Sequence, residues 1–159
     1  MKQTGRRFDA AAFYGGTNSE AYRYLGAHRA RRDGVEGYVF RVWAPNAAYV
    51  SVVGDFCGWN GYEHPMQRNA DGFWETFVAG LKQYDAYKYA VTSAQGRTVL
   101  KTDPYAFHAE TRPGNAGKLY DLRQCLWFSY TELESQLCLF ISQNTSQTPV
   151  FRIISCNLF

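Results

Sequence analysis

The sequence predicts an all-β protein, an antiparallel β-sandwich preceded by one short helix and followed by a tail of unassigned structure. Three observations support this class. Apolar and polar residues alternate from residue 35 onward, which is the period of strands rather than helices. Turn-forming residues interrupt the alternation about every ten residues, a spacing typical of sandwiches. Hydrophobic residues make up 46% and aromatic residues 17% of the chain, enough for a packed core.

The segment 1–34 is expected to carry the helix, ahead of the sandwich. Asn18 precedes a short run of apolar residues and can accept hydrogen bonds from the free amides of a first helical turn. Gly26 can end a helix in the left-handed conformation. The helix is therefore expected between Asn18 and Gly26.

The segment 35–122 is expected to form the sandwich. Its apolar runs are rich in aromatic and β-branched residues and are separated by proline, asparagine, aspartate and glycine. Asp71-Gly72 gives the strongest turn signal, because this pair tolerates the positive φ angles of a tight hairpin. The expected strands span residues 37–43, 49–53, 73–78, 86–92, 98–100 and 118–120. The side chains expected inside are Phe40, Val42, Val50, Val52, Phe77, Tyr89 and Val91, and core packing is also favoured for Trp43 and Trp74.

The tail, residues 123–159, differs in character from the rest of the chain. It holds three of the four cysteines, and neither a helical stripe nor strand alternation runs through it. It is expected to add no cooperative structure, because ordering about 35 residues costs on the order of 1–2 kcal/mol each without organised burial. A change of reading frame or a misplaced gene end would explain it, and an apolar extension that docks a partner is the alternative.

Charge and composition exclude several classes of protein. The net charge of +3 is too small for a typical nucleic-acid binder, and the one basic cluster, Arg29, Arg31 and Arg32, is expected to be a solvated loop. No stretch reaches the roughly 18 apolar residues of a membrane span, and the polar start does not fit a signal peptide. A cytoplasmic location is therefore expected, with no nucleic-acid or membrane partner.

No cofactor, metal site or catalytic residue is expected. The histidines lie in separate segments without metal-ligand spacing. The cysteines form no CxxC pair and fit reduced thiols; they are Cys57, Cys125, Cys138 and Cys156. The acidic residues at turns or strand faces are expected to be ordinary solvated carboxylates; they include Asp55, Glu63, Asp71, Glu75 and Asp103.

Four stretches together resemble the amino-terminal module of bacterial 1,4-α-glucan (glycogen) branching enzymes. They are YLGAH at residues 24–28, FRVWAPNA at 40–47, VSVVGDFCGWN at 50–60, and YKY at 87–89 with KTDPYA at 101–106. Order and spacing resemble this family from about Phe13 to Leu122. The second and third stretches are common in α-amylase-type enzymes, whereas the LGAH stretch and the DPYAF segment narrow the resemblance to branching enzymes.

The resemblance implies an immunoglobulin-like β-sandwich that contacts α-1,4-glucan chains and packs against a catalytic (β/α)8 barrel. In related modules the tryptophan that corresponds to Trp59 stacks on glucose, and the lysine that corresponds to Lys88 reaches sugar hydroxyls. A glucan offers apolar C–H faces edged by hydroxyls, so a flat aromatic surface with a few polar groups suits it. The carbohydrate-binding residues expected are Trp59, Lys88 and Asn60.

Each of these residues also has a purely structural interpretation. Trp59 lies in a loop after Gly58, where it could instead cover the edge of the sandwich. Lys88 faces away from the tyrosines on either side of it, as an ordinary solvent-facing lysine also would. Asn60 could simply hold its turn.

Two departures from the family pattern predict that glucan binding is weak or absent in the isolated module. Cys57 stands where the motif usually has asparagine, and a thiol does not donate and accept as an amide does. No second tryptophan lies near the turn at Gly96, where the chain has only Arg97, Thr98 and Val99. With one aromatic platform, the module could serve mainly as a packing partner for the barrel.

The chain as given is not expected to be an enzyme. Branching requires two carboxyl groups about 5 Å apart, which the resembled family carries on a barrel of about 250 residues. Only 37 of the 159 residues follow Leu122, so the chain is expected to be the module of a truncated branching enzyme. The alternatives are a stand-alone scaffold that tethers a partner protein to glycogen, or the amino-terminal module of a debranching-type enzyme or maltooligosyl-trehalose hydrolase.

Overall fold

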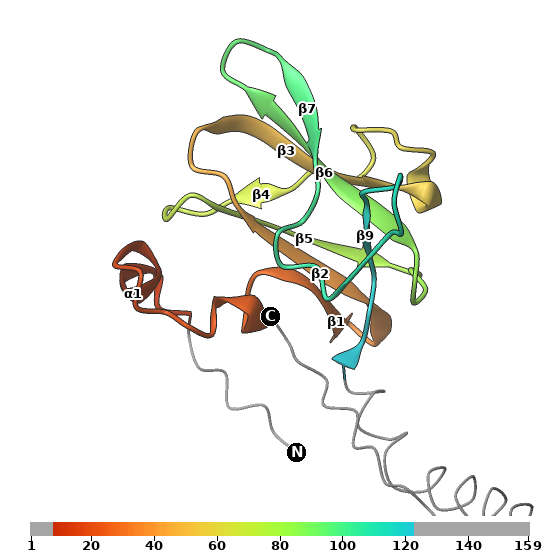
Figure 1. Ribbon diagram of the computed structural model, residues 1–159, viewed down its shortest axis with the longest axis horizontal. Helices are drawn as coiled ribbons and strands as arrows, with labels where there is room; N and C mark the ends of the chain where they lie inside the picture. Colours follow the sequence, from red (N-terminus) through yellow and green to blue (C-terminus); the bar gives the residue numbers. More distant parts are fainter. Residues whose placement is uncertain (1–7, 123–159) are drawn as a thin grey trace, which may run out of the picture. The chain divides into compact units, whose positions relative to one another are not determined.

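Two antiparallel sheets pack face to face in the computed structural model of the protein (Figure 1). The structure describes residues 8–122, and those up to Asp121 belong to one compact unit. The predicted β-sandwich is confirmed, whereas the expectations about the tail concern residues outside the described ones. No helix among the described residues is long and apolar enough to cross a membrane.

The first sheet has four strands in the order β1-β2-β5-β4. They are β1 (Gly26–Arg32), β2 (Val35–Trp43), β4 (Gln67–Arg68) and β5 (Phe73–Ala79). Asp33 and Gly34, with φ angles of 50° and 82°, make the tight turn between β1 and β2. The Asp71-Gly72 turn predicted from the sequence joins β4 to β5, with Gly72 at φ 76°.

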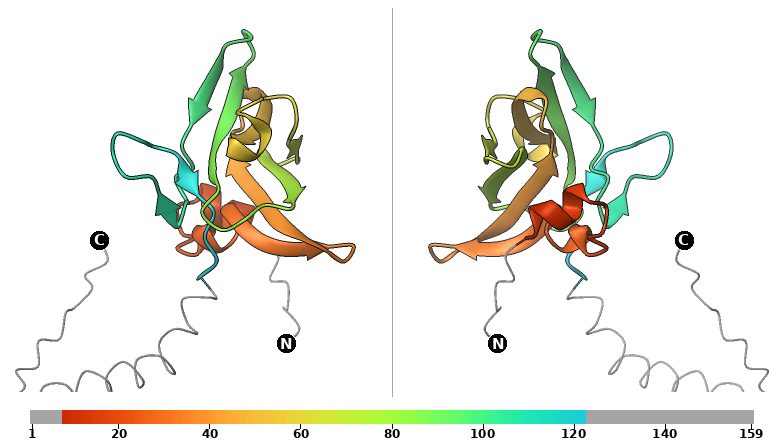
Figure 2. Two further views of the ribbon diagram at one scale, coloured as in Figure 1. Left: turned by 90° about the vertical axis from the view of Figure 1, so that its right-hand side faces the viewer. Right: turned by 90° about the vertical axis from the view of Figure 1, so that its left-hand side faces the viewer.

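The second sheet is built around β6 (Ala86–Ser93). One edge of β6 pairs with β3 (Ala47–Gly54), and the other edge pairs with β7 (Thr98–Lys101) and with β9 (Gly117–Lys118). β9 in turn pairs with β8 (His108–Ala109). Figure 2 shows β7 and the end of β6 extending as a hairpin beyond the rest of the sandwich, and all four residues of β7 are exposed.

The core lies between the sheets and takes side chains from both. Phe40 of β2 and Tyr87 of β6 meet edge to face, with ring centroids 5.2 Å apart. Trp74 of β5 is buried, as predicted, and its Nε1 donates to the Ala44 carbonyl oxygen over 2.8 Å. The expected core residues that are buried are Phe40, Val50, Val52 and Tyr89; Val42 and Val91 are only partly buried against the core.

Two residues predicted inside lie on the outer face of the first sheet instead. Phe77 pairs with Val39 and has the Arg32 guanidinium 5.5 Å from its ring centroid. Trp43, opposite Phe73 on the same face, is 43% exposed. Alternation predicts that neighbouring residues face opposite sides of a strand. Because both faces of β5 carry apolar residues, the pattern does not tell which side is the core.

An aromatic cluster from the N-terminal segment covers part of this outer face. The helix α1 (Ala10–Tyr14) begins after Asp9, whose Oδ1 accepts a hydrogen bond from the Ala12 amide at 2.9 Å. The rings of Phe8 and Phe13 pack on Phe73, with centroids 5.2 and 5.4 Å away. The first sheet is therefore apolar on both sides at this end. Trp43 packs against the N-terminal aromatic residues on the outer face instead of lying in the main core.

The helix and the basic cluster both differ from the prediction. The segment after Asn18 forms only one 3-10 turn, η1 (Ala21–Arg23), and Asn18 Oδ1 accepts from the Glu20 amide at 3.1 Å as in an Asx turn. Gly26, at φ 96°, begins β1 rather than ending a helix. The three arginines expected in a loop lie on β1, where Arg29 forms an ion pair with Glu36 at 2.5 Å. The sheet therefore begins before residue 35.

Asp103 was expected to be solvated, but its carboxylate is buried. Its Oδ2 accepts hydrogen bonds from the hydroxyls of Tyr87 and Tyr89 at 2.6 and 3.3 Å, and its Oδ1 accepts from the Tyr105 amide at 2.8 Å. Burial raises the pKa of Asp103, because these hydrogen bonds only partly replace its lost hydration. The network joins β6 to the segment after β7, beneath Gly26.

Glu75 lies between two arginines on the outer face of the first sheet. Its carboxylate accepts hydrogen bonds from Arg41, at 2.6 Å, and from Arg32. Burial alone would raise the pKa of Glu75, but the hydrogen bonds and charges of these arginines outweigh it and lower the pKa. Glu75 and Arg32 border an open groove of about 550 Å³, which Phe73 and Arg68 also line.

Candidate carbohydrate-binding site

A loop after β3 presents Trp59 at one end of the sandwich. η2 (Asp55–Cys57) makes a single 3-10 turn, after which Gly58 and Trp59 take positive φ angles of 55° and 62°. The Trp59 amide donates to the Gly54 carbonyl oxygen over 2.9 Å and closes the loop. Glycine adopts this backbone conformation readily, whereas tryptophan does so rarely. Among the described residues, Trp59 shares a positive φ with two other non-glycine residues, Asp33 and Tyr84.

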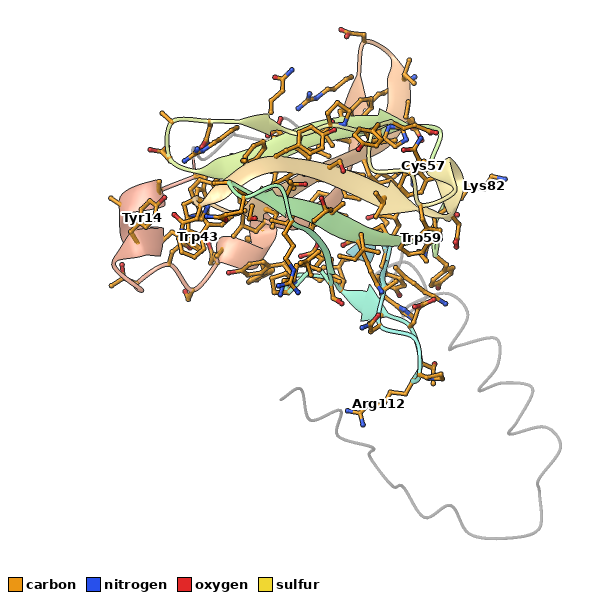
Figure 3. All side chains as sticks on the ribbon, turned by 90° about the horizontal axis from the view of Figure 1, so that it is seen from above. Tyr14, Trp43, Cys57, Trp59, Lys82 and Arg112 are labelled. Carbon is orange, nitrogen blue, oxygen red and sulfur yellow. The ribbon has the colours of Figure 1, made fainter. Side chains whose placement is uncertain are left out.

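The indole of Trp59 is held in place but remains accessible. Its Nε1 donates to Asp55 Oδ1 over 2.9 Å, which fixes the ring relative to η2. The residue is 37% exposed, so more than a third of its surface is open to a ligand. Figure 3 shows Trp59 and Cys57 at one end of the sandwich and Trp43 and Tyr14 at the other.

Lys88 reaches Trp59 from the neighbouring strand. It lies on β6 opposite Val53, and its flanking tyrosines, Tyr87 and Tyr89, point into the core, as their alternation predicts. The Lys88 ammonium group lies 5.8 Å from the centroid of the Trp59 ring, within range of a cation–π interaction. Two of the three residues predicted for the site therefore lie side by side.

Asn115, which was not predicted from the sequence, belongs to the same surface. Its Oδ1 accepts a hydrogen bond from Lys88 Nζ, and its backbone carbonyl accepts one from the Thr102 hydroxyl at 2.5 Å. The pairing of β9 with β6 brings Asn115 to Lys88 across 27 positions of sequence. Only its position just before a short predicted strand could have indicated it.

Asn60 holds the turn that follows Trp59. Its Nδ2 donates to Glu63 Oε1 over 3.2 Å, and its Oδ1 accepts from the Tyr62 amide at 3.1 Å. Both ends of the amide are therefore engaged within the loop. This geometry matches the structural interpretation of Asn60 given above.

The Cys57 thiol makes hydrogen bonds inside the loop. The Gly54 amide donates to Cys57 Sγ over 3.4 Å, and the thiol lies 3.4 Å from the Gly54 carbonyl oxygen. A thiol is a weak donor and a weak acceptor, but both functions are used here. The departure from the motif therefore leaves the loop internally bonded.

A second aromatic surface is absent from the turn at Gly96, where the described residues Arg97, Thr98 and Val99 are exposed. The loop itself supplies another ring, because Tyr62 is 85% exposed. Tyr62 was not predicted from the sequence, because it lies outside the motif that indicated Trp59. The groove on the first sheet contains none of these residues.

Comparison with known proteins points to a carbohydrate-binding module as the class of protein. Residues 24–106 match the family described as carbohydrate-binding module 48 (isoamylase N-terminal domain). This match covers more than half of the chain, and the chain belongs to this family.

Curated relatives agree with the branching-enzyme resemblance found in the sequence. The chain is 43% identical over 129 residues to the 1,4-alpha-glucan branching enzyme GlgB of Thermosynechococcus vestitus. This match covers 81% of the chain and 17% of the relative. The chain is 50% identical over 121 residues to the GlgB of Rubrobacter xylanophilus, in a match that covers 76% of the chain and 17% of the relative. The chain thus spans about a sixth of the length of these enzymes.

Solved structures share the fold. A maltotriose complex of a mutant pullulanase PulA from Klebsiella pneumoniae matches 62% of this chain and 11% of its own, with 29% identity and a TM-score of 0.50. A pullulanase from Anoxybacillus matches 67% of this chain and 16% of its own, with a TM-score of 0.50 and 24% identity, which shows the fold alone.

Proposed function

We propose that this chain is a non-catalytic module that binds α-1,4-glucan for a glycogen branching enzyme, with Trp59 as the stacking platform and Lys88 as a hydrogen-bond donor. The carrying observation is the position of the Lys88 ammonium group, 5.8 Å from the centre of an exposed indole. A ring with a cationic donor beside it matches the apolar face and hydroxyl edge of a sugar. Membership of a carbohydrate-binding family supports this choice of ligand.

The proposed site binds glucan weakly. With 37% of Trp59 exposed, and a tryptophan offering at most about 250 Å² of surface, stacking covers about 90 Å². At roughly 25 cal/mol/Å² this burial contributes about 2 kcal/mol. One hydrogen bond from Lys88 adds about 1 kcal/mol. A millimolar Kd requires about 4 kcal/mol, so the expected Kd is several millimolar.

The two asparagines near the platform have positioning roles in this proposal. Asn115 orients the Lys88 ammonium group toward the ring. Asn60 keeps the turn that presents Trp59, and its amide makes no sugar contact while both of its loop hydrogen bonds hold. If a sugar hydroxyl replaced one of these two hydrogen-bond partners, Asn60 would bind glucan, as the sequence predicts.

The similarity to branching enzymes supports a wider role for the module within a longer enzyme. In the proposed parent enzyme, a catalytic barrel outside the matched span carries out the α-1,4 to α-1,6 transfer in the cytoplasm and packs against the module. In this proposal the segment 1–34 contains β1 and, from Phe8 onward, the aromatic residues that cover the first sheet. The segment 35–122 carries the glucan site, and the segment 123–159 is the divergent tail. A stand-alone scaffold that tethers a protein to glycogen is the second candidate.

NMR titration of the 15N-labelled chain with maltoheptaose tests the proposal. The indole N–H signal of Trp59 should shift progressively, with a Kd of several millimolar. Cellohexaose, a β-1,4-linked glucan with a flat rather than curved chain, serves as the matched control and should cause smaller shifts. Absence of any shift at Trp59 with maltoheptaose, or equal shifts with both sugars, would contradict α-glucan recognition at this site.

A further inference from the structure

Three side chains with metal-binding atoms come together in the loop next to Trp59. The thiol of Cys57, the carboxylate of Glu63 and the imidazole of His64 each place one ligand atom within 4.8 Å of the other two. Cys57 is buried, His64 is half-buried and Glu63 is exposed, so the cluster opens to solvent on one side. The sequence did not indicate this group, because its spacing matches no common metal motif.

We propose that Cys57, Glu63 and His64 form a zinc-binding site. A thiolate, an imidazole and a carboxylate are the ligands that zinc takes in proteins, whereas calcium and magnesium prefer oxygen ligands alone. Three protein ligands leave the fourth tetrahedral position to water on the exposed side. On binding, the metal forms a bond to sulfur and the thiol proton passes to solvent.

The geometry requires only a small contraction. Ligand atoms of a tetrahedral zinc ion lie about 3.5 Å apart, given metal–ligand distances of roughly 2.0 to 2.3 Å. The three atoms here need to approach by about 1 Å from their upper limit of 4.8 Å. Because Glu63 is exposed and its side chain is long, rotation of its carboxylate can supply much of this movement.

Neighbouring groups already orient two of the three ligands. The Gly54 amide donates to Cys57 Sγ over 3.4 Å, and Asn60 Nδ2 donates to Glu63 Oε1 over 3.2 Å. The ring of His64 packs against Phe56, with centroids 5.4 Å apart. Hydrogen bonds from surrounding groups to the ligands, and packing against them, are typical of built metal sites.

A bound metal would join the two ends of the loop that carries Trp59. Cys57 lies before Trp59, and Glu63 and His64 lie after it, so one ion closes the loop from both sides. The zinc site stands on its own ligands and does not depend on glucan binding.

Cobalt absorption spectroscopy on the full-length chain tests the site. The cysteines outside the described residues are first changed to serine (Cys125→Ser, Cys138→Ser and Cys156→Ser), so that Cys57 is the one remaining thiol. Cobalt should then give a thiolate-to-metal charge-transfer band that saturates at one equivalent and disappears when zinc is added. Zinc should also raise the Tm of this protein. Absence of a saturable band would overturn the proposal.

Single substitutions in the same background identify the ligands. Cys57→Ser should abolish the charge-transfer band, and His64→Gln and Glu63→Gln should each weaken cobalt binding by about tenfold or more. His108→Gln, at an exposed histidine outside the cluster, is the matched control and should bind as the parent does. A band that survives Cys57→Ser, or equal weakening by His108→Gln, would refute this ligand set. Circular dichroism of each variant distinguishes loss of a ligand from loss of the fold.

Discussion

Trp43 and Trp74 were both predicted to lie in the core, but only Trp74 is buried. Substitutions at these two residues therefore provide a quantitative test of the sandwich. Trp74 is 6% exposed and hydrogen-bonded to the Ala44 carbonyl oxygen, whereas Trp43 is 43% exposed. Replacing a buried tryptophan by alanine costs about 3–5 kcal/mol. Loss of the hydrogen bond to the Ala44 carbonyl oxygen, which keeps the Ala47 amide as its donor at 3.2 Å, adds about 1 kcal/mol. Trp74→Ala should therefore lower the free energy of unfolding by about 4–6 kcal/mol.

The same change at Trp43 should have a much smaller effect. Trp43 meets Phe13 and Tyr14 edge to face, with centroids 5.6 and 6.0 Å away, and its Nε1 donates to the Tyr14 hydroxyl at the surface. Loss of these partly solvated contacts should cost about 1–2 kcal/mol.

Urea unfolding followed by circular dichroism measures both free energies. A domain of this size has about 5–15 kcal/mol of stability in total, so Trp74→Ala can unfold the protein outright. Trp74→Phe, which keeps a ring in the core, provides a measurable variant and should cost about 1–3 kcal/mol. Equal losses for Trp43→Ala and Trp74→Ala, or a greater loss at Trp43, would refute the assignment of inner and outer faces.

Three further predictions concern packing, pH and catalysis. Gly37→Ala should destabilise the protein by about 1–3 kcal/mol in the same urea assay, because a Cβ there would meet the Val78 carbonyl oxygen at 2.3 Å. Gly61→Ala is the control, because the nearest contact of its Cβ would be at 3.6 Å. The raised pKa of Asp103 means that its contribution to stability is full below its ordinary pKa of about 4 and is lost as pH rises through the raised value. The Tm of the Asp103→Asn variant relative to the Tm of the parent should therefore increase as pH rises. A Tm difference that does not change with pH would contradict burial of the Asp103 carboxyl group. Finally, the purified chain should leave the iodine spectrum and chain lengths of amylose unchanged, and enzyme-dependent α-1,6 branches would overturn the non-catalytic assignment.

The strands of the sandwich could be predicted because alternation and turns are local properties of the sequence. Six runs of alternating residues became β2, β3, β5, β6, β7 and β9, although β9 is shorter than expected. β1 was missed because its exposed positions carry arginines, which obscure the alternation, and because Gly26 resembles a helix end. α1 spans five residues, too few to show a helical period.

Which face of a strand is buried could not be predicted where both faces are apolar. Phe73 and Phe77 alternate with Trp74 and Val78 on β5, and both sets are largely hydrophobic. The choice depends on the N-terminal segment, whose aromatic rings cover Phe73 from outside. Only the three-dimensional structure shows that contact.

The candidate carbohydrate-binding site was also only partly predictable from the sequence. Trp59 and Lys88 belong to motifs with fixed neighbours, so a resemblance found them. Asn115 and the cluster of Cys57, Glu63 and His64 depend on how strands pair and loops close, which leaves no mark in residue spacing.

Maltoheptaose binding by matched tryptophan variants tests the central claim most directly. Trp59→Ala removes the proposed platform, and Trp43→Ala removes an exposed tryptophan at the opposite end of the sandwich (Figure 3). In an NMR titration, the Trp43→Ala variant should bind maltoheptaose with the several-millimolar Kd of the parent. The Trp59→Ala variant should show no binding while its Tm stays close to that of the parent. Unchanged binding by Trp59→Ala, or loss of the fold in that variant, would contradict the account.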